Sequence, residues 1–324
     1  MDRLAGRALK PCCTPAGAAS PDVVPLGFTP PERDRASVLK GMVAVPGGTY
    51  LLGGEDPDAN AGDGEGPVRE VVLGPFSVDP VAVTVAKFAT FVKATGHVTT
   101  AEREGWSYVF HLLLDPADRA AVVDAHVPGT PWWLPVRGAD WRHPGGPHSG
   151  VAQNHPVTHV SWYDACAYAA WAGKSLPTEA QWEAAARGGL VGTRYPWGGE
   201  LTPKGRHRAN IWQGRFPRVN SADDGFVGTA PVKTYPPNGY GLYQMAGNVW
   251  EWCADRWSTD WHAVAAPGTR EDPRGPSTGD ARVVRGGSYL CHDSYCNRYR
   301  VAARTRNTPD SSSGNTGFRC VVGA

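Results

Sequence analysis

Apolar residues recur at helical spacing in one early stretch of the chain, at Val85, Phe88, Phe91 and Val92. Residues three and four positions apart share one face of a helix, so the pattern predicts an amphipathic helix. Thr84 can cap its start, and Gly96 can end it in the left-handed backbone conformation. We therefore predict a helix between Thr84 and Gly96 that packs on a sheet.

Two further helices are marked by their capping residues. Ser161 opens the first, which is expected to end near Gly173. Thr178 with Gln181 three positions later matches a capping box for the second, which is expected to end at 188–189. Both helices should be short and well defined.

Short apolar runs bounded by turn residues predict the strands. Residues 42–50 form an apolar run that ends in Pro-Gly-Gly, most simply one strand of a hairpin. Residues 68–83 contain strand-like pieces around the Gly-Pro pair at 74–75. Further short strands are expected at 283–285 and 318–322.

Turns occupy much of the remaining chain. Its 40 glycines and 29 prolines among 324 residues favour irregular loops. No internal repeat, GxGxxG motif or alternation of strands and helices indicates a doubly wound fold. We predict an α+β fold: a single irregular, loop-rich domain over 41–324 with little regular secondary structure. Residues 1–40 lack apolar periodicity and are predicted to be a disordered leader.

Net charge and hydropathy limit the compartments in which we expect the protein and the kinds of partner that it can bind. The formal net charge is +1, and no sustained basic stripe favours nucleic acid. No apolar stretch approaches the roughly 18 residues of a membrane span, and the N-terminal residues lack the apolar run of a secretory signal. We expect a soluble cytoplasmic protein that acts as a monomer, without nucleic-acid or membrane partners.

The segment CHDSYC at 291–296 places two cysteines close together after a Gly-Gly pair. Its spacing leaves three interpretations open: a disulfide or inert thiols, a four-ligand metal site, or a functional site of two thiolates. Zinc would need a second ligand pair such as CxxC, which the chain lacks, whereas two thiolates suit Cu(I). Arg298, Arg300 and Arg304 follow closely and are expected to favour the thiolate form.

Several sequence blocks together resemble the formylglycine-generating enzymes. They are ANIWQG at 209–214, PNGYGLY at 237–243, GNVWEW at 247–252, RGGSYLCHDSYCNRYR at 285–300, NTPDSS at 307–312 and GFRC at 317–320. The resemblance runs from about residue 42 to the C-terminus. It implies the C-type lectin-like or sulfatase-modifying factor fold. The CHDSYC segment lies at the position of the family's cysteine pair.

The resemblance implies a copper-dependent oxidase that acts on an unfolded segment of a sulfatase. It would use O2 to convert the cysteine of a Cys-x-Pro-x-Arg motif to Cα-formylglycine. Cys291 and Cys296 would bind Cu(I), and the substrate thiolate would join them. Acid–base residues cannot break an unactivated Cβ–H bond, so the reaction needs a one-electron metal. Trp250, Ser288 and Tyr295 would line the oxygen side of the site.

The resemblance also implies two structural calcium sites, built from loops that supply oxygen ligands. The first set is Asn210, Ile211, Asp224 and Phe226, and the second set is Gln244, Gly247, Val249 and Glu251. Gln244 replaces the family's usual Asn, which lengthens that ligand by one methylene.

The substrate groove is expected to include Asn315 by resemblance. Glu102 and Glu104 are our candidates for binding the arginine of the motif. Two other functions stay open: a noncatalytic lectin-like binding paralogue and an iron-dependent sulfoxide synthase of the same superfamily. The cysteine pair favours the enzyme over the first. The second would carry a helical module with a histidine triad, and residues 1–40 contain no histidine.

Overall fold

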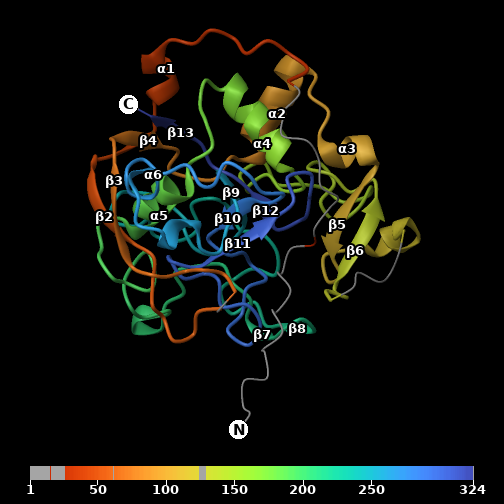
Figure 1. Ribbon diagram of the computed structural model, residues 1–324. Helices are drawn as coiled ribbons and strands as arrows, with labels where there is room; N and C mark the ends of the chain where they lie inside the picture. The colour runs from red at the N-terminus through yellow and green to blue at the C-terminus, as the bar shows by residue number, and fades with distance from the viewer. Residues whose placement is uncertain (1–14, 16–25, 61, 124–128, 324) are drawn as a thin grey trace.

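The computed structural model describes residues 15, 26–60, 62–123 and 129–323. At the centre of this part lies a four-stranded sheet with the order β11-β10-β9-β12 (Figure 1). Its strands are β9 (Trp250–Arg256), β10 (Arg282–Arg285), β11 (Arg304–Asn307) and β12 (Thr316–Gly317). β10 runs antiparallel to both β9 and β11, whereas β12 is parallel to β9. The strand predicted at 283–285 is thus confirmed as β10.

A three-stranded sheet joins segments from both ends of the chain. It comprises β1 (Val43–Val45), β4 (Phe76–Val78) and β13 (Val321–Gly323), with β4 in the middle. The two predicted pieces in 68–83 are confirmed as β3 (Arg69–Leu73) and β4. The strand predicted at 318–322 begins later than expected, at Val321.

The strand predicted in the run 42–50 is confirmed as β1, but it is not part of a hairpin with the strand that follows it. β1 pairs with β4, while β2 (Gly48–Leu52) pairs with β3 in a separate two-stranded sheet. A Cβ atom added at Gly47 would lie 2.9 Å from the nitrogen of Pro75. The glycine therefore lets the two chain corners pass closely as they cross between the sheets.

The three predicted helices are confirmed as α2 (Val85–Thr95), α4 (Trp162–Trp171) and α5 (Glu179–Arg187). Thr84 accepts the main-chain N–H of Lys87, and Gly96 has φ of 68°. Capping boxes begin α4 and α5. The apolar face of α2 packs on α4, where the ring of Phe88 stacks 6.0 Å from that of Tyr168.

One helix lies inside the predicted leader, so that prediction is wrong for α1 (Arg35–Leu39). Asp34 caps this helix, and Val38 is buried against the fold. The carbonyl of Pro15 accepts a hydrogen bond from the side chain of Asn307. Residues 1–14 and 16–25 of the predicted leader lie outside the described residues.

Several elements were not predicted. They are α3 (Thr100–Glu104), α6 (Pro267–Arg270), β5 (Trp106–Phe110), β6 (Trp133–Arg137), β7 (Gly214–Arg215), β8 (Val219–Asn220) and the 3₁₀ helices Pro116–Ala121, Pro203–Gly205 and Trp261–Ala263. β5 pairs with β6 at one side of the molecule (Figure 1). In the described part of the chain, no helix is both long enough and apolar enough to span a bilayer.

Candidate active site

Two short turns fix the cysteines of the loop at 291–296, hereafter the cysteine loop. Cys291 donates its main-chain N–H to the carbonyl of Ser288 (2.9 Å), and Cys296 donates to that of His292 (2.9 Å). Both side chains are thiols and belong to one buried apolar cluster with Trp250. Two soft donors in one apolar cluster fit Cu(I) better than a harder cation.

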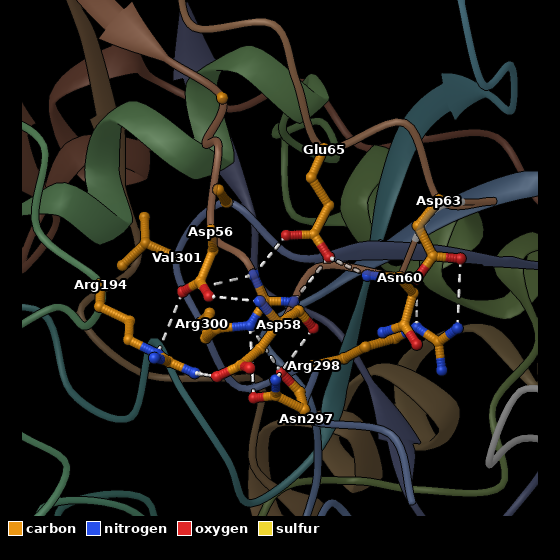
Figure 2. A network of polar contacts seen from close by, with 12 residues as sticks. Asp56, Asp58, Asn60, Asp63, Glu65, Arg194, Asn297, Arg298, Arg300 and Val301 are labelled. Atoms are coloured by element: carbon orange, nitrogen blue, oxygen red, sulfur yellow. Dashed lines mark hydrogen bonds and ion pairs between the residues drawn. The ribbon is translucent and has the colours of Figure 1, made fainter. Parts of the chain in front are cut away.

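The arginines that follow the loop are all paired, so they do not supply uncompensated charge to the thiols as predicted. Arg298 binds Asp63 (2.5 Å) and Arg300 binds Glu65 (2.5 Å), as Figure 2 shows. Arg304 binds Glu179 at 2.6 Å. Carboxylates far away in the sequence thus compensate the positive charge that we expected to favour the thiolate form.

A main-chain group instead polarises one sulfur. The N–H of Ser288 donates to Sγ of Cys291 at 3.4 Å. A hydrogen bond to the charged form of a group favours that form. The sulfur of Cys291 thus has a donor that does not depend on the arginines.

Ser288 is fully buried beside the cysteine loop, as expected for a residue of the site. Its Oγ accepts hydrogen bonds from Nδ2 of Asn315 (3.1 Å) and from the N–H of Leu290 (3.3 Å). Asn315, expected in the substrate groove, is buried to the same extent as Ser288 and contacts it through this hydrogen bond.

Tyr295 is held between two aromatic side chains that we did not predict. Its ring stacks on Phe216 at 4.7 Å and meets Trp132 edge to face at 5.0 Å. The signal in the sequence was only the general richness in aromatic residues. These contacts fix the ring plane, which leaves the hydroxyl as the polar end of an otherwise apolar stack.

A cleft of about 740 Å³ opens beside the cysteine loop, bordered by Tyr195, Tyr295, Cys296, Asn297 and Tyr299 among others. Burial is the largest cause that raises the pKa of Tyr299, followed by the charges of Tyr195 and Asp293. Both cysteines also contribute to this rise. Tyr299 therefore lies near both thiols and remains a neutral hydroxyl at physiological pH.

The carboxylates proposed to bind the substrate arginine do not border this cleft. Glu102 closes the capping box of α3 with Thr99 and pairs with Arg142 at 2.5 Å. Burial alone would raise the pKa of Glu102, but the hydrogen bonds from Thr99 and Arg142 leave it below the usual value. Glu104 is exposed at the end of the same helix. Glu102 is thus already neutralised by a partner within the chain.

The first predicted calcium set comes together in the structure. Asp224 accepts the N–H groups of Ile211 (2.9 Å) and Phe226 (3.2 Å), and burial raises its pKa. Oδ1 of Asn210 is buried and has no hydrogen-bond partner among the described residues. A buried oxygen without a donor beside a disfavoured carboxylate fits a hard cation.

The second predicted calcium set does not fit a cation. Both oxygens of Glu251 bind Arg319, each at 2.7 Å, and one also accepts Nε1 of Trp182. Gln244 uses its amide oxygen for Asn248 and its nitrogen for the carbonyl of Pro231. Gly247 and Val249 stand in the same turn, with Val249 buried. Arg319 already neutralises the only carboxylate of this set.

One histidine pair at a zinc-ligand spacing was overlooked in the sequence, namely His155 and His159. The structure uses both in other ways. Nδ1 of His155 meets the hydroxyl of Thr229 (2.8 Å), while the nitrogens of His159 meet Ser107 and the carbonyl of Pro144. Burial lowers the pKa of His159 to about 4. Over the described residues, no group of three or more His, Cys, Asp or Glu side chains is arranged to hold a metal ion.

Comparison with known proteins identifies the class. The model of the sulfatase-modifying factor enzyme 1-like domain matches residues 28–324. The solved structure of PvdO from Pseudomonas aeruginosa has the same fold, with a TM-score of 0.63 at 23% identity, covering 87% of this chain and 94% of that one. The predicted C-type lectin-like fold of the sulfatase-modifying factors is thus confirmed. The chain belongs to the sulfatase-modifying factor enzyme 1-like family.

Within this family the chain is similar to two formylglycine-generating enzymes. That of Thermomonospora curvata is 65% identical over 297 residues, which cover 91% of this chain and 97% of that protein. That of Streptomyces coelicolor is 59% identical over 310 residues, which cover 95% and 94%. These similarities confirm the resemblance stated from the sequence blocks.

Proposed function

We propose that this chain generates formylglycine, as the relatives of that name do, by oxidising a cysteine of a sulfatase. The substrate cysteine would lie in an unfolded Cys-x-Pro-x-Arg segment, O2 would be the oxidant, and Cys291 and Cys296 would hold Cu(I). The observation that carries the proposal is the pair of buried thiols at the two ends of one loop, beside Ser288 and Trp250.

Bound Cu(I) would supply the one-electron chemistry with O2 that no side chain can supply. Oxidation of the CH2–SH group to the level of an aldehyde removes two electrons and two protons, which O2 accepts. Water then replaces the sulfur, which leaves as hydrogen sulfide.

The protein's own residues hold and shield the reacting groups. The N–H of Ser288 fixes the sulfur of Cys291, and the buried ring of Trp250 helps to keep water from the thiols. Because Asn315 and Leu290 already donate to Oγ of Ser288, its hydroxyl hydrogen remains available to the substrate. A fixed donor in a dry site stabilises developing charge without reorganisation.

The test is mass spectrometry of a Cys-Thr-Pro-Ser-Arg peptide incubated aerobically with the protein and Cu(I). We expect an aldehyde in place of the thiol, and no product from Cys291→Ser or Cys296→Ser. Ser294→Ala, on the exposed part of the same loop, is the matched control and should retain turnover.

Each other outcome has a definite meaning. An unchanged peptide with the wild-type protein would favour the noncatalytic alternative. Product formation with iron but not with copper would overturn the copper assignment. Substantial turnover by Cys296→Ser under copper-replete conditions would remove that residue from the site.

A further inference from the structure

An acidic segment far away in the sequence lies against the residues that follow the cysteine loop. In this segment, residues 56–60 and 62–65, the side chains of Asp63 and Glu65 face Arg298 and Arg300 (Figure 2). Asp63 binds Arg298 and Glu65 binds Arg300 through two-point ion pairs. The side chains of Glu65 and Arg300 are each 1% exposed. These pairs anchor the acidic segment firmly, since breaking a buried ion pair is strongly destabilising.

The main chain of each cysteine is held by the same two kinds of hydrogen bond. Each cysteine donates its main-chain N–H to a nearby carbonyl, that of Ser288 or of His292, and the carbonyl of each cysteine accepts a hydrogen bond from a distant part of the chain. For Cys291 that donor is the main-chain N–H of Trp212 at 3.1 Å. For Cys296 it is Nδ2 of Asn60 at 3.0 Å. The second anchor is therefore a side chain, which substitution can remove.

The turn directly after Cys296 needs such an anchor. Asn297 has φ of 52°, in the left-handed region that non-glycine residues rarely adopt. Its carbonyl accepts Nε of Arg300 at 3.0 Å, and its Nδ2 donates to the carbonyl of Asp58 at 3.2 Å. The acidic segment thus holds the chain on both sides of the peptide bond between Cys296 and Asn297.

The geometry points to Asn60 as a positioning residue for Cys296, which fixes the main chain that carries this thiol. Asn60 is itself fixed by the acidic segment, because its carbonyl accepts the N–H of Asp63 (2.9 Å) and its N–H faces Oε1 of Glu65. The ion pair of Glu65 with Arg300 therefore supports the bond from Asn60 to Cys296. This inference rests on the proposed function, since Cys296 matters most there as a copper ligand.

The test uses the metal-free, reduced, full-length protein and measures the alkylation rate of each cysteine by site-resolved mass spectrometry. Cys296 is 1% exposed, so alkylation requires local opening of the loop. Asn60→Ala should raise the rate at Cys296 by about fivefold, the factor expected for loss of one hydrogen bond, and the rate at Cys291 by less than twofold. Asn60→Asp should raise the rate at Cys296 further, because a carboxylate oxygen then faces the carbonyl.

The matched control is Asp58→Asn, which removes a largely exposed ion pair with Arg194 but keeps the carbonyl that Asn297 uses. It should leave both rates within about twofold, as surface pairs contribute little. A melting temperature lowered by less than about 4 °C in Asn60→Ala would show that the fold is intact. If Asn60→Ala does not yield folded protein, Asn60→Ser carries the same test.

A second readout is competition for Cu(I) with a chelator, without substrate. Asn60→Ala should weaken binding by about fivefold, whereas Asp58→Asn should not. Equal acceleration at both cysteines, or equal effects of Asn60→Ala and Asp58→Asn, would overturn the positioning role. Failure of the wild-type protein to bind Cu(I) would instead overturn the copper proposal, and the alkylation rates would still test Asn60.

Discussion

The two predicted calcium sets differ in sequence support, because Gln244 departs from the family pattern in the second, and they have opposite environments. In the first, burial raises the pKa of Asp224, and an oxygen of Asn210 has no donor among the residues that the structure describes. In the second, Arg319 binds both oxygens of Glu251. The difference teaches that ligand type alone does not define a cation site. A buried carboxylate must also lack an internal cation before a metal ion has a charge to neutralise.

The largest expected effect comes from removing the internal cation of the second set. Arg319→Met should destabilise the protein by about 3–5 kcal/mol, because it leaves the charge of Glu251 buried without a partner. Urea unfolding with and without calcium measures this loss. A calcium-dependent recovery in Arg319→Met, beyond the response of the wild-type protein, would show that the second set can take a cation after all.

Calcium itself should stabilise the wild-type protein through the first set. At one hundred times Kd the gain is about 2.7 kcal/mol. Asp224→Asn should abolish that gain, because it removes the carboxylate of the first set. In the chelated protein two effects oppose each other: the variant lacks a carboxylate whose pKa is raised on folding, but its single amide oxygen can replace only one of the two acceptors for Ile211 and Phe226. Melting curves of both proteins with calcium and with chelator test this, and an equal calcium response in both would eliminate the first set.

A third buried carboxylate, Asp255, belongs to neither calcium set, so it reports the effect of burial on stability without that of calcium. Burial, followed by the charge of Glu179, raises the pKa of Asp255 to about 7. The folded state then holds the extra proton between the ordinary Asp value, about 4, and about 7, so stability should fall as pH rises through this window.

The Asp255→Asn variant should flatten this decline by up to about 1.4 kcal/mol per pH unit. Unfolding in urea at several pH values with chelator measures the slope. Calcium should not alter the difference between the two proteins. A wild-type slope that matches that of the variant would mean that Asp255 is ionised throughout.

The smallest effect is expected at Gln244. Gln244→Asn restores the residue usual in the family, yet should change the calcium response by less than about 0.5 kcal/mol, since Glu251 remains paired with Arg319. Melting temperatures with calcium and with chelator provide the comparison. A clear new calcium response would instead show that the length of the Gln244 side chain prevents calcium binding at the second set.

Local signals in the sequence were sufficient for the longer helices and for the cysteine pair. Thr84 and Gly96 bounded α2 because capping chemistry is encoded within a few residues. The partners of strands are not encoded in this way, so β1 was wrongly predicted to belong to a hairpin. The run of five residues in α3 was too short to show periodicity, although Thr99 and Glu102 formed its capping box.

The residues that surround the cysteine loop in space could not be predicted from the sequence. Asp63 and Glu65 stand 235 positions from the arginines they neutralise, so the basic residues after Cys296 looked unpaired. The same distance concealed the contact of Asn60 with Cys296. Charge in a folded chain depends on such long-range pairing, and composition near a residue does not determine it.

The central position of β4 has a consequence for biosynthesis. One edge of β4 pairs with β1 early in the chain, but the other must await residues 321–323. During translation that edge presents open main-chain groups, which neighbouring nascent chains could pair with. Its length of three residues limits how much of this edge is available. Because β4 is short, few of its main-chain groups are exposed to other chains before β13 is synthesised and pairs with it.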